Sequence, residues 1–110
     1  SYDLLAWDAY NRSPDYADPA ALIGPSCRIN AKLGKPFAVA ELGSVLAPDD
    51  DGSRRARWLT ELGSELRRCR ARFVAYFDKA WDGGAQDFRL RDTPSLRAWR
   101  TLGQNRPDGS

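Results

Sequence analysis

The sequence predicts an α/β protein built from consecutive strand–helix units with parallel strands. Three short apolar runs, at residues 2–10, 37–42 and 72–77, have the length of strands, and segments with helix signals separate and follow them. The order is strand, helix, strand, helix, strand, loop, helix, which indicates parallel strands joined by helical crossovers. Such units fit either a small doubly wound layer with helices on both faces or three units of a (β/α)8 barrel.

Turn and capping residues delimit the first strand and the first helical region. Residues 11–15, NRSPD, have the composition of a turn. Asp18-Pro19 supplies an N-cap and a proline at the first helical position, so a helix should begin there. Gly24-Pro25 predicts an interruption, after which a second helical stretch runs to Leu33. Gly34 stands where a C-terminal glycine belongs.

The second strand, residues 37–42, is apolar until it reaches Glu41, as expected for a strand covered on both faces. The loop at residues 48–53 is rich in aspartate and ends in Ser53, a candidate N-cap. Over residues 54–69 leucines recur with helical spacing, which predicts an amphipathic helix.

The last part of the chain predicts one more strand and one more helix. Residues 72–77, RFVAYF, form the third strand, and Asp82-Gly83-Gly84 is a flexible turn. Thr93-Pro94-Ser95 opens a helix that ends at Gly103.

Length and composition describe one small domain of ordinary globular character. The chain has 110 residues, of which 42% are hydrophobic and 29% charged. We assign residues 1–103 to the domain and residues 104–110 to a polar tail. No apolar run has the length of a transmembrane helix and no signal-peptide pattern is present, so we expect no membrane partner. Because the sequence contains no methionine, we expect a processed product or a piece of a longer protein.

The net charge of +2 is mild, but the arginines are clustered. Arg54, Arg55 and Arg57 form one group, and residues 67–72 hold four more arginines. A nucleic-acid surface is one interpretation. Carboxylates are interspersed, and neither arginine group contains an aromatic residue to stack on bases. We therefore interpret both groups as solvated helix surface and expect no nucleic-acid partner.

The chain has two cysteines, Cys27 and Cys69, and no histidine. Two distant cysteines are too few for a zinc site, and the lack of histidine excludes His-based triads and histidine metal sites, so no metal or cofactor is predicted. Two separate buried thiols are the simpler interpretation. The alternative is a disulfide, which requires an oxidising compartment and could stabilise the fold by about 4 kcal/mol.

The most informative residue is Glu41, a carboxylate at the end of an apolar strand. Its desolvation would be costly unless a partner or a chemical role compensates. In parallel α/β folds the carboxyl ends of neighbouring strands meet at one edge and carry the chemistry. The other strand ends would bring carboxylates, an amide and aromatic rings to that edge: Trp7, Asp8, Tyr10, Asn11, Phe77, Asp78 and, nearby, Trp81. Rings and carboxylates together are typical of a sugar-binding cleft.

Structural roles are the competing interpretation for these residues. A local arginine or a helix N-terminus could hold Glu41, while Asp8 and Tyr10 could serve loop structure, and Trp81 could simply pack.

Three segments, DLLAWDAYN, GKPFAVAELGS and FVAYFD followed by DFRLRDTPSLRAW, resemble the last three β/α units of a glycoside hydrolase family 26 barrel, the β-mannanase-like group. The resemblance runs from Tyr2 to about Leu102 and implies that the chain contains strands six to eight of a (β/α)8 barrel. It implies that Glu41 is the nucleophile of a retaining glycosidase and that Tyr10 orients it by a hydrogen bond. Phe77 stands where such enzymes more usually have a tryptophan as sugar platform.

One part of the expected machinery is missing from this stretch. A retaining glycosidase uses two carboxyl groups about 5–5.5 Å apart. In enzymes of this kind the acid/base glutamate follows strand four, before the segment that resembles this chain. Glu61 and Glu65 lie in a predicted crossover helix and cannot replace it. We therefore expect the 110-residue chain to be inactive alone.

The predicted function is that of a retaining, endo-acting glycoside hydrolase for a β-linked polysaccharide such as mannan or glucan, represented by its C-terminal portion. Substrate-binding roles fall to Trp7, Asp8, Asn11, Phe77, Asp78 and Trp81. The alternative is a non-catalytic carbohydrate-binding or structural module, in which Glu41 would be locked in a salt bridge with no open cleft above it. Expected partners are an oligosaccharide or polysaccharide and either the remainder of the barrel or a second copy of the chain, because the outer strands would otherwise be bare edges. A secreted location is favoured.

Overall fold

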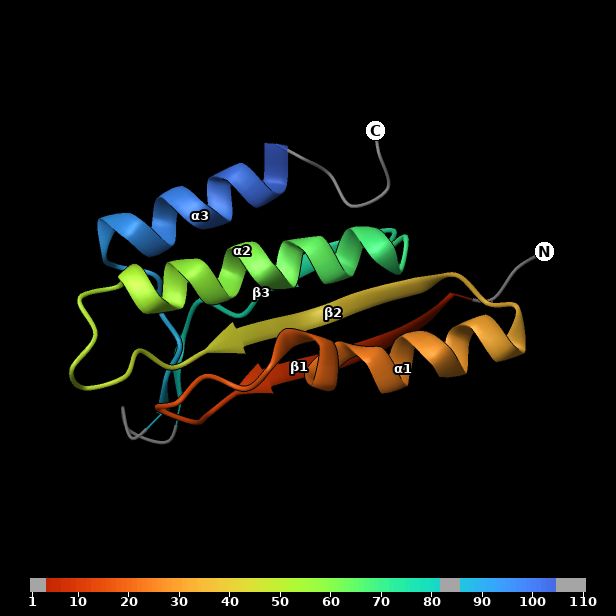
Figure 1. Ribbon diagram of the computed structural model, residues 1–110, viewed down its shortest axis with the longest axis horizontal. Helices are drawn as coiled ribbons and strands as arrows, with labels where there is room; N and C mark the ends of the chain where they lie inside the picture. The colour runs from red at the N-terminus through yellow and green to blue at the C-terminus, as the bar shows by residue number, and fades with distance from the viewer. Residues whose placement is uncertain (1–3, 82–85, 105–110) are drawn as a thin grey trace.

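The computed structural model describes residues 4–81 and 86–104, and its elements follow the predicted order, except that two short strands lie in the segment predicted as a loop (Figure 1). They are β1 (Leu5–Asn11), α1 (Pro19–Leu33), β2 (Phe37–Ser44), α2 (Ser53–Arg68), β3 (Val74–Tyr76), β4 (Ala80–Trp81), β5 (Gln86–Asp87) and α3 (Thr93–Gln104). The first three strands form a parallel sheet in the order β1-β2-β3, and β4 pairs antiparallel with β5. The predicted α/β class with parallel strands is confirmed. The turn at 82–84 and tail residues 105–110 lie outside the described residues.

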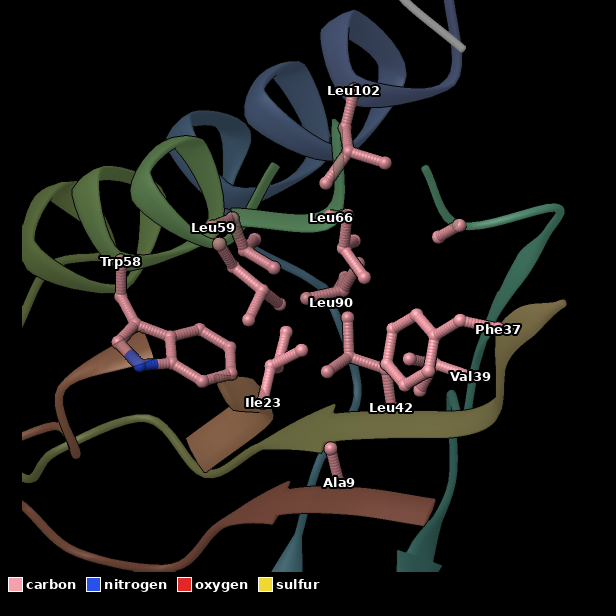
Figure 2. Close-up of a cluster of buried hydrophobic side chains, with 12 residues drawn as sticks. Ala9, Ile23, Phe37, Val39, Leu42, Trp58, Leu59, Leu66, Leu90 and Leu102 are labelled. Atoms are coloured by element: carbon pink, nitrogen blue, oxygen red, sulfur yellow. The ribbon is translucent and has the colours of Figure 1, made fainter. Parts of the chain in front are cut away.

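All three helices pack against the same face of the parallel sheet. Ile23 of α1, Leu59 of α2 and Leu102 of α3 share one apolar cluster with Val39 and Leu42 of β2 (Figure 2). Several residues of the other face are exposed: Ala6, Asp8, Ala40, Glu41 and Ala75. Within the described residues no helix covers that second face, whereas a doubly wound layer has helices on both. The expectation that the second strand is covered on both faces is therefore wrong at Ala40 and Glu41.

The first helix is continuous through the predicted interruption. Pro25 lies inside α1, whose cap geometry is otherwise as predicted: Asp18 accepts from the backbone N–H of Ala20, and Gly34 is left-handed with φ 66°. A proline normally clashes with the Cβ of the preceding residue in a helix, but here that residue is Gly24, which has none. Burial of Ile23 before the proline and Asn30 after it fixes both halves against the sheet.

Asp50, rather than Ser53, caps the N-terminus of α2. Its carboxylate accepts backbone N–H bonds from Gly52, Arg54 and Arg55 and a hydrogen bond from the Tyr16 hydroxyl. Burial opposes ionisation of this carboxyl, but these hydrogen bonds outweigh it and lower the pKa of Asp50 to about 2. The cap therefore also anchors the loop after β1 to the loop before α2.

A disulfide joins Cys27 of α1 to Cys69, the residue that caps the end of α2. The simpler interpretation of two separate thiols is wrong, because the two helices pack side by side and bring the Cα atoms to 5.9 Å. The third strand is shorter than predicted, at Val74–Tyr76, although the N–H groups of Arg72 and Phe77 still bond to β2. None of the described helices combines the length and the apolar character needed to span a membrane.

Candidate functional site

A bulge in β2 decides where Glu41 points. Trp7 of β1 pairs with Val39, but the next residue, Asp8, pairs with Glu41, so Ala40 is an extra residue without a partner on β1. Strict alternation from Val39 would turn Glu41 toward the helices and the core. The bulge moves it to the open face, and Leu42 returns to the core. This is the local reason why an apolar strand can carry a carboxylate.

Tyr10 meets Glu41 on the open face. Its hydroxyl donates a hydrogen bond to Glu41 Oε1. Burial, the hydrogen bond to Glu41 and the charge of that carboxylate raise the pKa of Tyr10 to about 12, so the phenol stays a donor at neutral pH. Among the described residues Glu41 belongs to no ion pair. The carboxylate is therefore oriented by a neutral hydroxyl and otherwise exposed.

The pair lines a cavity of about 280 Å³ at the carboxyl ends of the strands, together with Arg12, Phe77 and Phe88. Gly43 pairs with Tyr10 in the β1–β2 register and leaves room for the aromatic rings that form one wall of the cavity. A Cβ at Gly43 would lie 3.0 Å from the Tyr10 ring and 3.2 Å from the Phe88 ring. A side chain there would push the two rings away, so the glycine is needed for the close approach.

Phe88 completes the wall of rings, although it was not among the residues predicted for the site. The residue is 1% exposed, and its ring centroid lies 5.2 Å from that of Tyr10 and 6.0 Å from that of Phe77. Its carbonyl accepts from the Tyr76 hydroxyl at 2.6 Å, and its N–H donates to the Lys79 carbonyl at 3.0 Å. Phe88 follows β5, in a segment that reads only as loop in the sequence.

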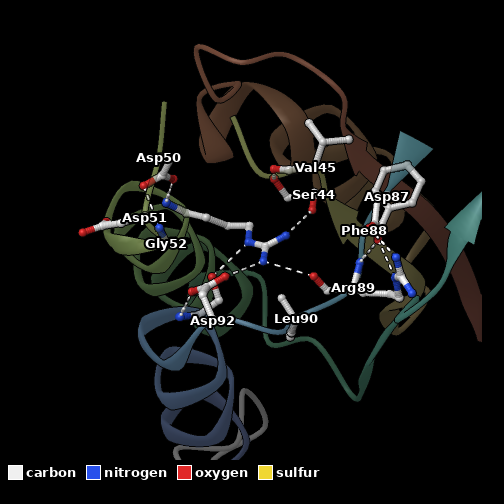
Figure 3. A network of polar contacts seen from close by, with 12 residues as sticks. Ser44, Val45, Asp50, Asp51, Gly52, Asp87, Phe88, Arg89, Leu90 and Asp92 are labelled. Carbon is white, nitrogen blue, oxygen red and sulfur yellow. Dashed lines mark hydrogen bonds and ion pairs between the residues drawn. The ribbon is translucent and has the colours of Figure 1, made fainter. Parts of the chain in front are cut away.

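A buried guanidinium fixes the segment that carries Phe88. Arg55 is 1% exposed, and its Nη1 donates to the Ser44 carbonyl at 2.9 Å. Its Nη2 donates to the Arg89 carbonyl at 3.1 Å and pairs with Asp92 at 2.7 Å. Figure 3 shows Ser44, from the end of β2, and Arg89 and Asp92, from the segment before α3, converging on this guanidinium. The expectation that the first arginine group is solvated is therefore wrong for Arg55, which ties β2 to the start of α3.

Three residues predicted at the end of β1 take different places. Asp8 is exposed beside Glu41 on the open face but does not line the cavity. Trp7 is on the helix side of the sheet, where its indole N–H donates to Asn30 Oδ1 at 2.7 Å. Asn11 is 1% exposed, and its amide bonds to Ser44 and to the loop after β1. As the chain is folded here, neither Trp7 nor Asn11 faces the cavity.

The residues predicted near the third strand are also divided. Phe77 lines the cavity edge-on to Tyr10, with ring centroids 5.9 Å apart. Asp78 does not line it, and its carboxylate accepts from the Leu90 N–H at 2.7 Å, which supports the same segment as Phe88. The side chain of Trp81 lies outside what the structure describes. The structure thus brings together Tyr10, Glu41 and Phe77.

Comparisons with known proteins add no assignment: no protein-family model and no curated protein matches the chain. In the described part of the chain, no group of three or more acidic or cysteine side chains is placed to hold a metal ion.

Proposed function

We propose that the chain is a three-unit sector of a (β/α)8 barrel and carries the nucleophile half of a retaining β-glycosidase site. The observation that carries the proposal is the Tyr10–Glu41 hydrogen bond inside a ring-lined cavity at the carboxyl ends of parallel strands. Glu41 would attack the anomeric carbon, and the Tyr10 hydroxyl would hold the attacking carboxylate in position. Phe77 supplies apolar surface for a sugar ring, and the buried Phe88 ring packs behind Tyr10 and Phe77.

The one-sided packing of the helices supports the barrel part of the proposal. In a barrel the strands follow one another in chain order and every crossover helix lies outside. The sheet has that order, β1-β2-β3, and α1, α2 and α3 share its one covered face. The open face, where Glu41 lies, would then be the barrel interior.

The second candidate, a non-catalytic module, would leave Glu41 in a salt bridge without an open cleft. The observed carboxylate has no ion pair within the described residues and borders a cavity instead, which favours the catalytic proposal. Catalysis also needs a second carboxyl group as acid/base. Asp8 is exposed beside Glu41, but on a neighbouring strand of the same sheet rather than across a cleft from it. We therefore keep the expectation that the chain alone hydrolyses no polysaccharide.

Sugar binding at the cavity is the experiment that tests the site. Addition of β-1,4-mannotriose or cellotriose to the isotope-labelled chain should shift the NMR signals of Tyr10, Glu41, Phe77 and Phe88. Phe77→Ala should weaken binding several-fold, since it removes one ring of the wall. Phe73→Ala is the matched control, because Phe73 is an exposed phenylalanine outside the cavity. Shifts confined to other surfaces, or equal weakening by both variants, would contradict the proposal.

A further inference from the structure

The cavity has a cation as well as a carboxylate. Arg12 lies just beyond the end of β1 and lines the same cavity as Glu41. Its guanidinium carbon is 4.8 Å from the centroid of the Tyr10 ring and 5.8 Å from that of Phe88. Its Nε donates to Gln86 Oε1 at 2.9 Å. Two rings and an amide thus hold the plane of an exposed guanidinium in one orientation.

The outer nitrogens of this guanidinium are available. Within the described residues Arg12 belongs to no ion pair and its Nη groups form no hydrogen bond. A second cation lies at the same wall, where the Lys79 ammonium is 5.9 Å from the centroid of the Phe77 ring. Lys79 is likewise in no ion pair with a described residue. Two cations therefore flank the aromatic wall, and neither forms an ion pair with a described residue.

The charges also impose a direction on any ligand. The carboxylates of Asp8 and Glu41 lie side by side on the sheet, so they repel an anionic group placed over the strands. Arg12 follows β1 and offers paired N–H donors that suit a carboxylate or a sulfate. A ligand that suits both sides of the cavity therefore presents hydroxyls or its anomeric centre to the Glu41 carboxylate and an acidic substituent to the Arg12 guanidinium.

We propose that this cavity selects an acidic sugar, with Arg12 as the residue that recognises the anionic substituent of the unit bound against Tyr10 and Phe77. The inference rests on the proposed function and narrows its substrate class from β-linked polysaccharides in general to those carrying a carboxylate or a sulfate. A uronic acid and a sulfated sugar share the required chemistry. The planar carboxylate matches the guanidinium fork with two parallel hydrogen bonds.

The test compares three matched ligands on the isotope-labelled 110-residue chain by NMR titration. They are methyl β-glucopyranoside, methyl β-glucopyranosiduronate and methyl β-glucopyranoside 6-sulfate. We expect both anions to bind about tenfold more tightly than the neutral glycoside, the gain of one charge-assisted contact. Tighter binding of the uronate than of the sulfate identifies a carboxylate ligand, and the reverse identifies a sulfate. Raising the ionic strength should weaken the binding of both anions and leave the binding of the neutral glycoside unchanged.

Arg12→Gln should abolish the preference for the anions and leave binding of the neutral glycoside intact. Arg12→Lys should keep part of the preference, because the charge remains and the fork is lost. Arg28→Gln, which removes an exposed arginine of α1 outside the cavity, is the control and should change nothing.

The outcomes separate this inference from the function on which it rests. If all three ligands bind equally at the cavity, or if the anion preference survives Arg12→Gln, then Arg12 does not recognise an acidic sugar. The proposed glycosidase function would be unaffected by either result. If none of the three ligands perturbs the signals of Tyr10 and Glu41, the sugar site itself is refuted, and the inference falls with it.

Discussion

Replacement of Arg55 by methionine should be among the most damaging single changes in this protein. Methionine keeps the apolar stem but removes every donor of the guanidinium. Asp92, whose side chain is 15% exposed, would lose its cation, and the carbonyls of Ser44 and Arg89 would each lose one donor. Removing one partner of a buried ion pair costs about 3–5 kcal/mol, since the other charge stays buried and unpaired.

The assay is urea unfolding followed by tryptophan fluorescence. Arg57→Met, an exposed arginine two residues further along α2, is the matched control and should change the free energy of unfolding by less than about 0.5 kcal/mol. If Arg55→Met unfolds the chain outright, Asp92→Asn provides the second test. It should destabilise the parent protein and stabilise the Arg55→Met variant, because it removes the unpaired charge. A loss below about 1 kcal/mol for Arg55→Met, or a change of the same sign for Asp92→Asn in both backgrounds, would mean that Arg55 and Asp92 do not form a stabilising buried pair.

Three further predictions concern the fold. The Cys27→Ser/Cys69→Ser variant should lose about 4 kcal/mol of unfolding free energy, because the disulfide closes a loop of 42 residues. A loss below about 1 kcal/mol in urea unfolding would contradict this. Asp50 has a folded pKa of about 2 against an ordinary value of 3.8, so its contribution of about 2 kcal/mol is complete above pH 4 and is lost as the pH falls through 2. Asp50→Asn should remove that part of the acid dependence of stability, and an unchanged dependence would argue against the assigned cap. Because one sheet face is open and β1 and β3 are edge strands, the chain should associate with a second copy or with the rest of a barrel. A compact, cooperative monomer in sedimentation equilibrium at micromolar concentration would contradict this.

Local signals predicted most of the fold. Asp18, Pro19 and Gly34 mark the ends of α1 as the capping rules require, and the leucine spacing located α2. The misjudged features depend on long-range packing. Pro25 is tolerated because residues on both sides of it are held against the sheet, and Cys27 meets Cys69 only once α1 and α2 are side by side.

The sequence predicted the kind of site, a carboxylate among aromatic rings, but only some of the residues that line it. Tyr10 and Glu41 were expected together on the strength of the family resemblance, and the structure places them in contact. Periodicity alone would have buried Glu41, because an extra residue in one strand of a pair leaves no mark in a single sequence. Phe88 and Arg55 were missed, although both side chains are buried. Nothing in a single sequence distinguishes a buried loop phenylalanine or a buried helical arginine from one that is exposed to solvent.

If Glu41 is a nucleophile, it can be trapped covalently. A 2-deoxy-2-fluoro β-mannoside or β-glucoside with a dinitrophenolate leaving group needs no acid assistance, so the lack of a partner carboxyl does not prevent the first step. Attack by a Glu41 oxygen on the anomeric carbon forms a glycosyl ester and releases dinitrophenolate. We expect one adduct per chain, located on Glu41 by peptide mapping, absent in Glu41→Gln and retained in the exposed-glutamate control Glu61→Gln. No adduct, or an adduct on Asp8 instead, would contradict it.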